Sequence, residues 1–335
     1  MAETRPTQVA MIGVGGMARH HLQWMLKQTD TTHVRIVCEP SEASYAATAQ
    51  LFRDNGIEPP PNEPDFEKLL TDHASELDVA FIITPHNQHY LQAAACLESG
   101  LDVLLEKPMV MNGEEAVKLI ETRDRTGKLL VVAFNGSMSP NIRTAVKLLR
   151  SGELGEMLSI SATVWQNWGN LTEGAWRQIP EIAGGGFMFD TGAHMLNTVV
   201  DLAGEEFTEV RAWLDNRGRA VDIMGVVIGK LKSGKLVTMH GSGDAGGVGS
   251  DVRVFGTEGV IVTGVWGEKF ELIKDPKKGP EPIEVPASLG TWQQFLAVRA
   301  GTLQNPCPPE VGLRMARLWD AIKESAAQNG APVSL

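Results

Sequence analysis

A glycine-rich turn near the start of the chain has the residue types and spacing that bind a dinucleotide. Gly13, Gly15 and Ala18 form a G-x-G-x-x-A pattern that follows an apolar run and opens a helical one. The glycines permit a tight turn and a close backbone approach to pyrophosphate. Glu39, at the end of the next apolar run, can accept hydrogen bonds from the ribose of NAD and repel the 2′-phosphate of NADP. The alternative is a turn that only joins a strand to a helix.

Polar residues also follow two later apolar runs, where parallel strands would end. Thr84-Pro85-His86-Asn87-Gln88-His89 is the first group and Glu106-Lys107-Pro108 is the second. Ligands of open α/β sheets bind at these strand ends, where a lysine can donate to a substrate oxygen. Lys107 could equally be a surface lysine in a turn. His86 and His89 could begin a metal site, but no third ligand follows at a characteristic spacing, so we predict none.

The most informative segment of the second half ends at His194 and contains three consecutive glycines. Asp190 and His194 are spaced i, i+4, so on a helix they would share one face and could touch. An aspartate that orients a histidine makes a general base. The alternative is an aspartate that caps the helix and a histidine buried in the core.

Aromatic and amide side chains gather just before these glycines. They are Trp165, Gln166, Asn167, Trp168, Asn170 and Trp176. Sugars present apolar C–H faces and hydroxyl edges, so this mixture suits a polyhydroxylated substrate. The same tryptophans could instead fill a core or a subunit interface, and the sequence leaves both interpretations open.

Short apolar runs alternate with helical patterns over the first part of the chain, which predicts a doubly wound parallel sheet. The runs are nearly continuous, as in strands that are covered by helices on both faces. The predicted strands are residues 9–12, 33–38, 77–84, 102–105 and 129–134. The predicted helices are residues 17–28, 43–55, 66–72, 88–99 and 114–126. We therefore predict a dinucleotide-binding domain over residues 1–134.

The remaining residues, 135–335, predict a second domain with a largely antiparallel sheet and helices on one face. Glycine turns such as Ser233-Gly234 favour hairpins. The glycine-rich run 241–247 leads into a strand, so we predict a flexible connection and no phosphate site there. The predicted strands are 157–168, 209–214, 224–231, 235–240, 252–255 and 260–262, and the helices are 141–150, 292–300 and 311–327.

Composition narrows the class of protein. A chain of 335 residues with 43% hydrophobic and 21% charged residues is typical of a globular protein of two domains. The net charge of −11 disfavours nucleic acid and membrane surfaces as partners. Cys38, Cys96 and Cys307 are isolated, and neither a leader nor a membrane span is evident, so we predict a cytoplasmic protein.

The motifs also occur in a characteristic order from about residue 8 to about residue 330. After the glycine turn come Thr84-Pro85-x-x-x-His89, Glu106-Lys107-Pro108, Trp176-Arg177, Gly184-Gly185-Gly186 and Asp190-x-Gly192-x-His194. In this the chain resembles the glucose–fructose oxidoreductase/inositol dehydrogenase/rhizopine-catabolism (Gfo/Idh/MocA) family. The resemblance implies a Rossmann domain followed by an α/β domain with an open-faced sheet that forms homodimers or homotetramers. It also implies NAD(P)-dependent oxidation or reduction of a sugar, inositol or related polyol.

Carried over residue by residue, the resemblance makes Lys107, Asp190 and His194 the catalytic residues, with His194 exchanging the proton. With the glycine turn it gives these cofactor-binding residues: Gly13, Gly15, Gly16, Met17, Ala18, Glu39, Thr84, Pro85, Asn87, His89, Glu106, Lys107, Trp176 and Arg177. The predicted substrate-binding residues are Lys107, Asn135, Trp165, Asp190, His194 and Asn197, of which Trp165 is taken from the aromatic and amide cluster and not from the resemblance. We expect the cofactor to be NAD, with NADP left open.

Two positions depart from the usual pattern of the family. Three residues after His194 the family commonly has an acid, whereas this chain has Asn197. If that position touches substrate, the preferred sugar will differ from that of inositol dehydrogenases. Members often carry an arginine after the fifth strand, where this chain reads Asn135-Gly136-Ser137-Met138. We therefore expect a neutral polyhydroxylated ring and not a phosphorylated or carboxylated substrate.

The predicted reaction is hydride transfer between the nicotinamide and a secondary alcohol or ketone. His194 would take the hydroxyl proton and Lys107 would stabilise the developing oxyanion, which requires both side chains to reach one substrate. Two other functions fit the same fold. One is an NAD-assisted glycosidase, and the other is a non-catalytic regulator that senses dinucleotide. The regulator would be favoured by loss of the lysine or the histidine, and both are present.

Overall fold

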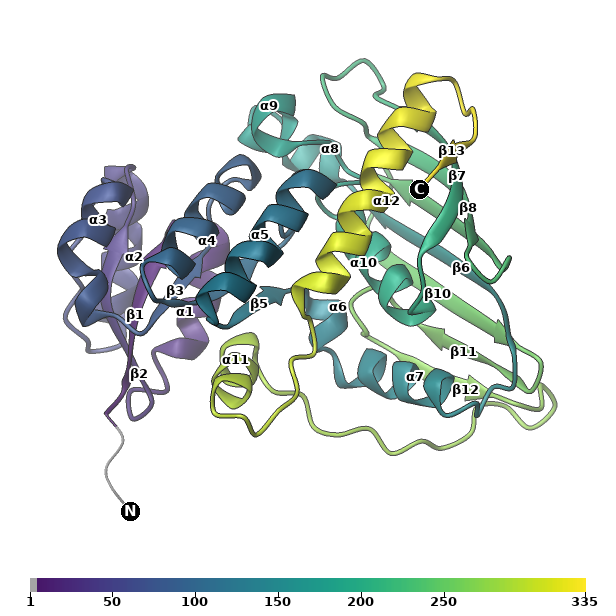
Figure 1. Cartoon of the computed structure of the whole chain (residues 1–335), viewed down its shortest axis with the longest axis horizontal. Coiled ribbons are helices and arrows are strands. Elements are labelled where there is room, and N and C mark those ends of the chain that lie inside the picture. The colour runs from purple at the N-terminus through teal and green to yellow at the C-terminus, as the bar shows by residue number, and fades with distance from the viewer. Residues whose placement is uncertain (1–4) are drawn as a thin grey trace. The chain divides into compact units, whose positions relative to one another are not determined.

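The computed structural model describes residues 5–335 and divides into two compact units (Figure 1). Unit 1 contains the chain up to Met109, Val117–Ala133 and Leu289–Pro309. Unit 2 contains Val110–Ala116, Phe134–Ser288 and Glu310–Leu335. Two segments therefore differ from a single division at residue 134. Val110–Ala116 belongs to unit 2, and Leu289–Pro309 belongs to unit 1.

Unit 1 is built around a parallel five-stranded sheet of order β2-β1-β3-β4-β5. The strands are β1 (Thr7–Ile12), β2 (Thr32–Cys38), β3 (Val79–Ile82), β4 (Asp102–Glu106) and β5 (Leu130–Ala133). The helices are α1 (Gly16–Met25), α2 (Glu42–Asp54), α3 (Phe66–His73), α4 (His89–Glu98) and α5 (Gly113–Thr126). Short 3₁₀ turns are η1 (Ala74–Glu76) and η2 (His86–Gln88). All residues of β3 and β5 are buried, and the predicted doubly wound sheet is confirmed.

A late segment completes unit 1. Helix α11 (Thr291–Arg299) belongs to this unit although it lies far from the rest in sequence. Its Trp292 donates from Nε1 to Thr32 Oγ1 at 2.7 Å. The same indole stacks on Phe81, with ring centroids 6.2 Å apart. These contacts depend on residues more than 200 positions away, which local sequence patterns do not record.

Unit 2 holds an eight-stranded sheet of order β12-β11-β10-β6-β9-β8-β7-β13, antiparallel except for the parallel pair β6 and β9. Its strands are β6 (Met157–Gln166), β7 (Phe207–Asp215), β8 (Met224–Leu231), β9 (Leu236–Ser242), β10 (Val248–Gly256), β11 (Gly259–Thr263), β12 (Phe270–Ile273) and β13 (Val333–Ser334). Its helices are α6 (Asn135–Met138), α7 (Pro140–Arg150), α8 (Trp168–Leu171), η3 (Trp176–Gln178), α9 (Pro180–Ala183), α10 (Gly192–Ala203) and α12 (Pro309–Ala327).

Burial in this sheet alternates along the strands, so one face is covered and the other is open. In β8 every second residue is buried, from Gly225 to Leu231. Helix α10 is buried along its whole length and packs on β6 and β9. The mostly antiparallel sheet is confirmed, while the predicted strand 157–168 is too long, because the chain turns into α8 at Trp168. Strands β12 and β13 were not predicted.

None of the helices formed by residues 5–335 combines the length and the apolar character that a bilayer span requires.

Candidate active site

The glycine turn lies where the sheet of unit 1 changes direction. The chain leaves β1 for the edge strand β2, whereas β3 pairs with the other side of β1, which is the usual ligand-binding point of such sheets. Gly13 has a φ of +81°, and a Cβ there would lie 2.7 Å from the carbonyl oxygen of Ile83. Only glycine fits that position without a shift of backbone.

The next two glycines have a different environment. A Cβ on Gly15 or Gly16 would meet no atom within 4 Å. Helix α1 begins here with no side-chain cap and no acidic residue in its first turn, so its first N–H groups can receive an anion. Ala18 is fully buried and Met17 is 46% exposed. These features fit the pyrophosphate of a dinucleotide.

Glu39 is fixed beside this turn by the backbone. Its Oε2 accepts from Val14 N and its Oε1 accepts from Ser41 N, both at 2.9 Å. Asn62, which the sequence did not suggest, bonds both the N–H and the carbonyl of Glu39. The carboxylate is therefore fixed beside the glycine turn, and its predicted contact with the ribose of NAD stays a prediction.

Replacing Glu39 with alanine is expected to reduce the preference for NAD over NADP about tenfold, because the repulsion of the 2′-phosphate disappears. The measurement is the dissociation constant of each coenzyme by titration calorimetry. Glu42→Ala is the matched control, since Glu42 is exposed in the first turn of α2. An unchanged ratio of the two constants would remove Glu39 from coenzyme selection.

The turn after β3 is tied to the turn that carries Lys107. His89 is fully buried, and its Nδ1 lies 2.7 Å from the carbonyl oxygen of Pro108. Its Nε2 lies 2.9 Å from the carbonyl oxygen of Thr84. His89 thus joins the two turns in this structure, and its predicted contact with cofactor stays a prediction, as it does for Pro85 and Asn87. Among residues 5–335 no group of three or more His, Cys, Asp or Glu side chains is arranged for a metal ion.

Glu106 also fixes the backbone of Lys107. Its Oε2 accepts from Lys107 N at 3.0 Å, and its Oε1 lies 2.7 Å from Nε2 of His21 on α1. Burial raises the pKa of this carboxyl, but the bond and charge of His21 and the charge and N–H of Lys107 outweigh it. The pKa of Glu106 therefore lies below its ordinary value. Lys107 itself is half-buried.

The lowered pKa of Glu106 predicts a loss of stability in acid. The ionised Glu106 carboxylate contributes fully to the free energy of unfolding above the pKa of the unfolded state, which is about 4.3. This contribution is lost as the pH falls through the lower pKa of the folded state. Glu106→Gln should reduce the free energy of unfolding at neutral pH by about 2 kcal/mol and flatten its acid dependence. Urea unfolding between neutral and acid pH measures both. The exposed Glu121→Gln is the control, and curves parallel to wild type would contradict the assignment.

In unit 2, the prediction that Asp190 and His194 share a helix is wrong. Helix α10 begins at Gly192, and Asp190 lies in the turns before it. The capping alternative is also wrong, because the N-cap residue is Thr191 and no side chain caps the helix. Asp190 Oδ2 instead accepts from Trp168 Nε1 at 2.8 Å and pairs with Arg177 Nε at 3.1 Å. Its proposed action on His194 remains a prediction.

His194 contacts two aromatic rings. It is 8% exposed, and the ring of the buried Phe134 lies at 89° to the imidazole with ring centroids 5.9 Å apart. The half-buried Trp266 lies at 5.8 Å with its plane tilted by 58°. Sequence reasoning missed Trp266, which lies far along the chain in a loop without a motif.

The glycines before Asp190 are positioned by a buried carboxylate that was also missed. Asp222 accepts from Gly186 N at 2.7 Å and from Met188 N at 2.8 Å. A Cβ on Gly186 would lie 1.9 Å from the carbonyl oxygen of Asp222, so this residue must be glycine. Burial raises the pKa of Asp222 despite the two bonds.

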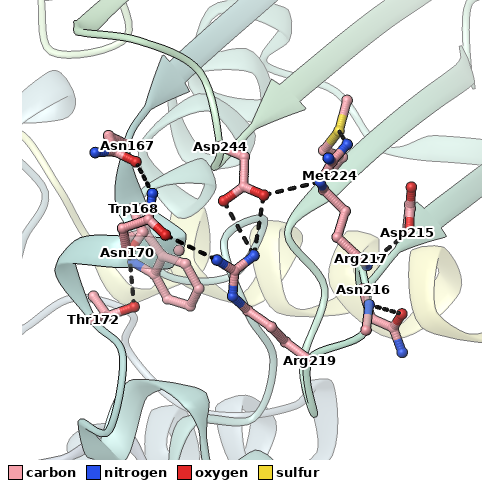
Figure 2. Close-up of polar contacts among 12 residues, drawn as sticks. Asn167, Trp168, Asn170, Thr172, Asp215, Asn216, Arg217, Arg219, Met224 and Asp244 are labelled. Carbon is pink, nitrogen blue, oxygen red and sulfur yellow. Dashed lines mark hydrogen bonds and ion pairs between the residues drawn. The ribbon is translucent and has the colours of Figure 1, made fainter.

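The segment that carries Trp168 is clamped by a polar cluster (Figure 2). Asp244 pairs with Arg219 at 3.0 Å and with Arg217 at 2.9 Å. Arg219 also donates to Asn170 Oδ1 at 3.1 Å. The glycine-rich run 241–247, predicted as a flexible connection, thus supplies the carboxylate that anchors the residues around Trp168.

Four other predicted residues are placed as follows. Asn197 is fully buried and donates to Ser137 Oγ, and its predicted contact with substrate stays a prediction. Trp165 packs against Gly249 on the open sheet face, which favours the interface alternative. Arg177 lies over the ring of Trp176 at 4.6 Å. Asn135 is exposed at the start of α6.

Comparison with known proteins agrees with both units. The family of oxidoreductases with an NAD-binding Rossmann fold matches residues 7–134, and the GFO/IDH/MocA C-terminal domain matches residues 142–262. The chain belongs to the Gfo/Idh/MocA family. The resemblance inferred from the motifs is therefore confirmed, together with the NAD(P) cofactor and the class of dehydrogenases that act on CH–OH groups.

Named relatives share moderate identity. "Oxidoreductase P35" of Formosa agariphila is 27% identical over 73% of this chain and 78% of its own. Levoglucosan dehydrogenase of Pseudarthrobacter phenanthrenivorans is 29% identical over 56% of this chain and 50% of its own. D-glucoside 3-dehydrogenase of Escherichia coli is 27% identical over 59% of this chain and 54% of its own. This Gfo/Idh/MocA chain thus spans about half the length of the last two.

Solved structures share the fold over nearly the whole chain. Levoglucosan dehydrogenase in complex with NADH and levoglucosan gives a TM-score of 0.80 at 23% identity, covering 98% of this chain and 99% of that one. The WlbA dehydrogenase of a Chromobacterium violaceum source, in complex with NADH and UDP-GlcNAcA, gives 0.83 at 19% identity, covering 99% and 96%.

Proposed function

We propose that the protein transfers a hydride between NAD and a secondary alcohol or ketone of a sugar, inositol or related polyol. The observation that carries this proposal is that a chain of this family retains Lys107, Asp190 and His194. NADP remains compatible with the fold, although the fixed carboxylate of Glu39 favours NAD.

The residues divide the work as follows. NAD, when bound, accepts or returns the hydride. His194 takes the proton from the substrate hydroxyl, and Asp190, held by Trp168 and Arg177, keeps that imidazole oriented. Lys107 donates to the same oxygen and stabilises its developing negative charge. Lys107 can do so because Glu106 and His89 fix the turn on which it stands.

The substrate is a neutral polyhydroxylated ring in this proposal. Asn135, where family members often carry arginine, is exposed and offers an amide but no charge. The guanidinium of Arg177 is already paired with Asp190. Neither residue therefore supplies a free cation for a phosphate or carboxylate group.

An assay for reduced coenzyme tests the function. Neutral cyclic polyols, aldoses, uronic acids and sugar phosphates are offered with NAD or NADP, and absorbance of the reduced coenzyme is followed. We expect reduction with at least one neutral ring substrate. Cleavage of a glycoside without accumulation of NADH would instead show the NAD-assisted glycosidase, and coenzyme binding with no turnover of any compound would show the regulator.

We also propose that a second copy of the chain covers the open face of the sheet in unit 2, giving a homodimer or homotetramer. Trp213 and Val226 are paired in register there, and Ile228 and Leu236 continue the apolar surface. All four are between 44% and 55% exposed. A cytoplasmic location is proposed because the three cysteines are buried as thiols, which suits a reducing compartment.

Ile228→Lys is expected to yield folded monomers, because it places a charge in this apolar surface without disturbing a core residue. Light scattering measures the mass and a thermal melt confirms folding. Gln328→Lys, an exposed change near the end of α12, is the control. A monomeric wild type, or an unchanged mass for Ile228→Lys, would exclude this interface.

A further inference from the structure

The loop between β11 and β12 places an aromatic side chain beside the proposed base. Trp266 is only half-buried, yet its ring centroid lies 5.8 Å from that of His194. Phe134, the other aromatic residue in contact with this imidazole, is fully buried. His194 therefore has one aromatic neighbour that belongs to the core and one that offers surface to a ligand.

Several bonds hold this loop rigidly. Thr198 on α10 donates to the carbonyl oxygen of Val265 at 2.7 Å, and Val265 N donates to Ser250 Oγ at 2.9 Å. Trp266 N donates to Glu268 Oε2 at 3.2 Å. Asn141 Nδ2 donates to the carbonyl oxygen of Gly267 at 2.8 Å. The backbone on both sides of the tryptophan is therefore fixed to three other parts of unit 2.

The polar end of α6 meets the same loop. A Cβ on Gly136 would lie 2.6 Å from the carbonyl oxygen of Val265, so the backbones of these residues are in close approach. Their neighbours in sequence are the exposed amide Asn135 and the half-buried indole Trp266. No hydrogen bond from the indole N–H reaches another of residues 5–335. The indole of Trp266 thus brings a flat apolar face and an N–H group close to His194.

We propose that Trp266 determines substrate specificity by receiving the apolar C–H face of a cyclic polyol next to His194. This rests on the proposed function and narrows its substrate class. Rings whose hydroxyls are mostly equatorial present a flat C–H face, whereas open-chain polyols are flexible and do not keep such a face. The indole contributes little binding free energy to a flexible open-chain polyol. Trp266 therefore discriminates between cyclic and open-chain polyols of similar composition.

The test compares Trp266→Leu, which keeps an apolar cover but loses the flat ring, with Trp266→Phe, which keeps a ring. The cyclic probes are myo-inositol, scyllo-inositol and methyl β-D-glucopyranoside, and the open-chain probe is sorbitol. For Trp266→Leu we expect the KM of the cyclic substrate to rise about tenfold, with kcat much less affected. Trp266→Phe should stay close to wild type, and the values for sorbitol should not change.

Trp24→Leu is the matched control, because Trp24 is 58% exposed at the far end of α1. The dissociation constant of NAD should be the same in every variant. A fall in kcat that is equal for cyclic and open-chain probes, at constant KM, would show that Trp266 only packs on His194, and the proposal would be wrong.

A binding measurement distinguishes a failure of this proposal from a failure of the proposed function. Titration calorimetry of the protein saturated with NADH measures the affinity for each cyclic probe without requiring turnover. Binding that weakens in Trp266→Leu but not in Trp24→Leu supports the role of Trp266 even if no probe is oxidised, in which case only the proposed function fails. Absence of binding for all three cyclic probes, or binding unaffected by Trp266→Leu, overturns the inference.

Discussion

Replacing Lys107 with methionine is expected to reduce kcat by a factor of about 100 to 1,000 while the affinity for NAD remains nearly unchanged. The proposed role of this lysine is to donate to the substrate oxygen as negative charge develops there. That interaction is strongest in the transition state, so its loss appears in turnover more than in ground-state binding.

Methionine is suited to this test because it preserves an unbranched apolar stem. Two backbone bonds of the turn persist without the ammonium group, since Glu106 accepts from Lys107 N and His89 lies against the carbonyl of Pro108. The variant should therefore fold normally, and circular dichroism together with a thermal melt checks this. Steady-state kinetics then gives kcat, and calorimetry gives the dissociation constant of NAD.

Lys278→Met is the control, because that side chain is 84% exposed in a loop of unit 2. It should behave as wild type in both measurements. Turnover in Lys107→Met within a few-fold of wild type would show that the oxyanion is stabilised by another group. Loss of NAD affinity at unchanged kcat would make Lys107 a cofactor-binding residue alone.

The strands of unit 1 were predictable because each is a nearly continuous apolar run between polar turns. β8 of unit 2 was predicted with its observed limits, Met224–Leu231, because its alternation is regular. β12 is short and carries a charged residue at Glu271, and it is defined by pairing with β11. Such a strand depends on its neighbour, so its sequence alone is a weak signal.

The site shows the same division between local and distant determinants. The glycine turn was predictable because each of its requirements is met within a few residues. Asp190 was misplaced because the i, i+4 rule assumes a helix, whereas Asp222, more than 30 residues away, folds the preceding segment into turns. Trp266 reaches His194 only through the pairing of β10 with β11 and the anchoring of the loop by Thr198. Residues that position or shield the base come from parts of the chain that no short motif connects.

Gly13 and Gly15 of the dinucleotide turn are expected to show opposite defects when each is replaced by alanine. Gly13→Ala should lower the free energy of unfolding by about 2 to 4 kcal/mol, because the positive φ is strained and the new Cβ meets backbone at 2.7 Å. Gly15→Ala should leave stability unchanged, because its φ of −67° is ordinary and its Cβ meets nothing within 4 Å. It should instead raise the dissociation constant of NAD about tenfold or more, since a methyl group then stands where the pyrophosphate approaches.

Gly127→Ala separates the effect of backbone strain at positive φ from the effect of a steric clash of the added Cβ. This glycine also belongs to unit 1 and has a φ of +65°, but a Cβ there would meet no atom within 4 Å. It should cost only about 1 kcal/mol and leave NAD binding unchanged. Urea unfolding and calorimetric titration of the three variants give both quantities. If Gly15→Ala bound NAD as tightly as wild type, the pyrophosphate could not lie against that backbone, and the assignment of the first N–H groups of α1 to the anion would be wrong.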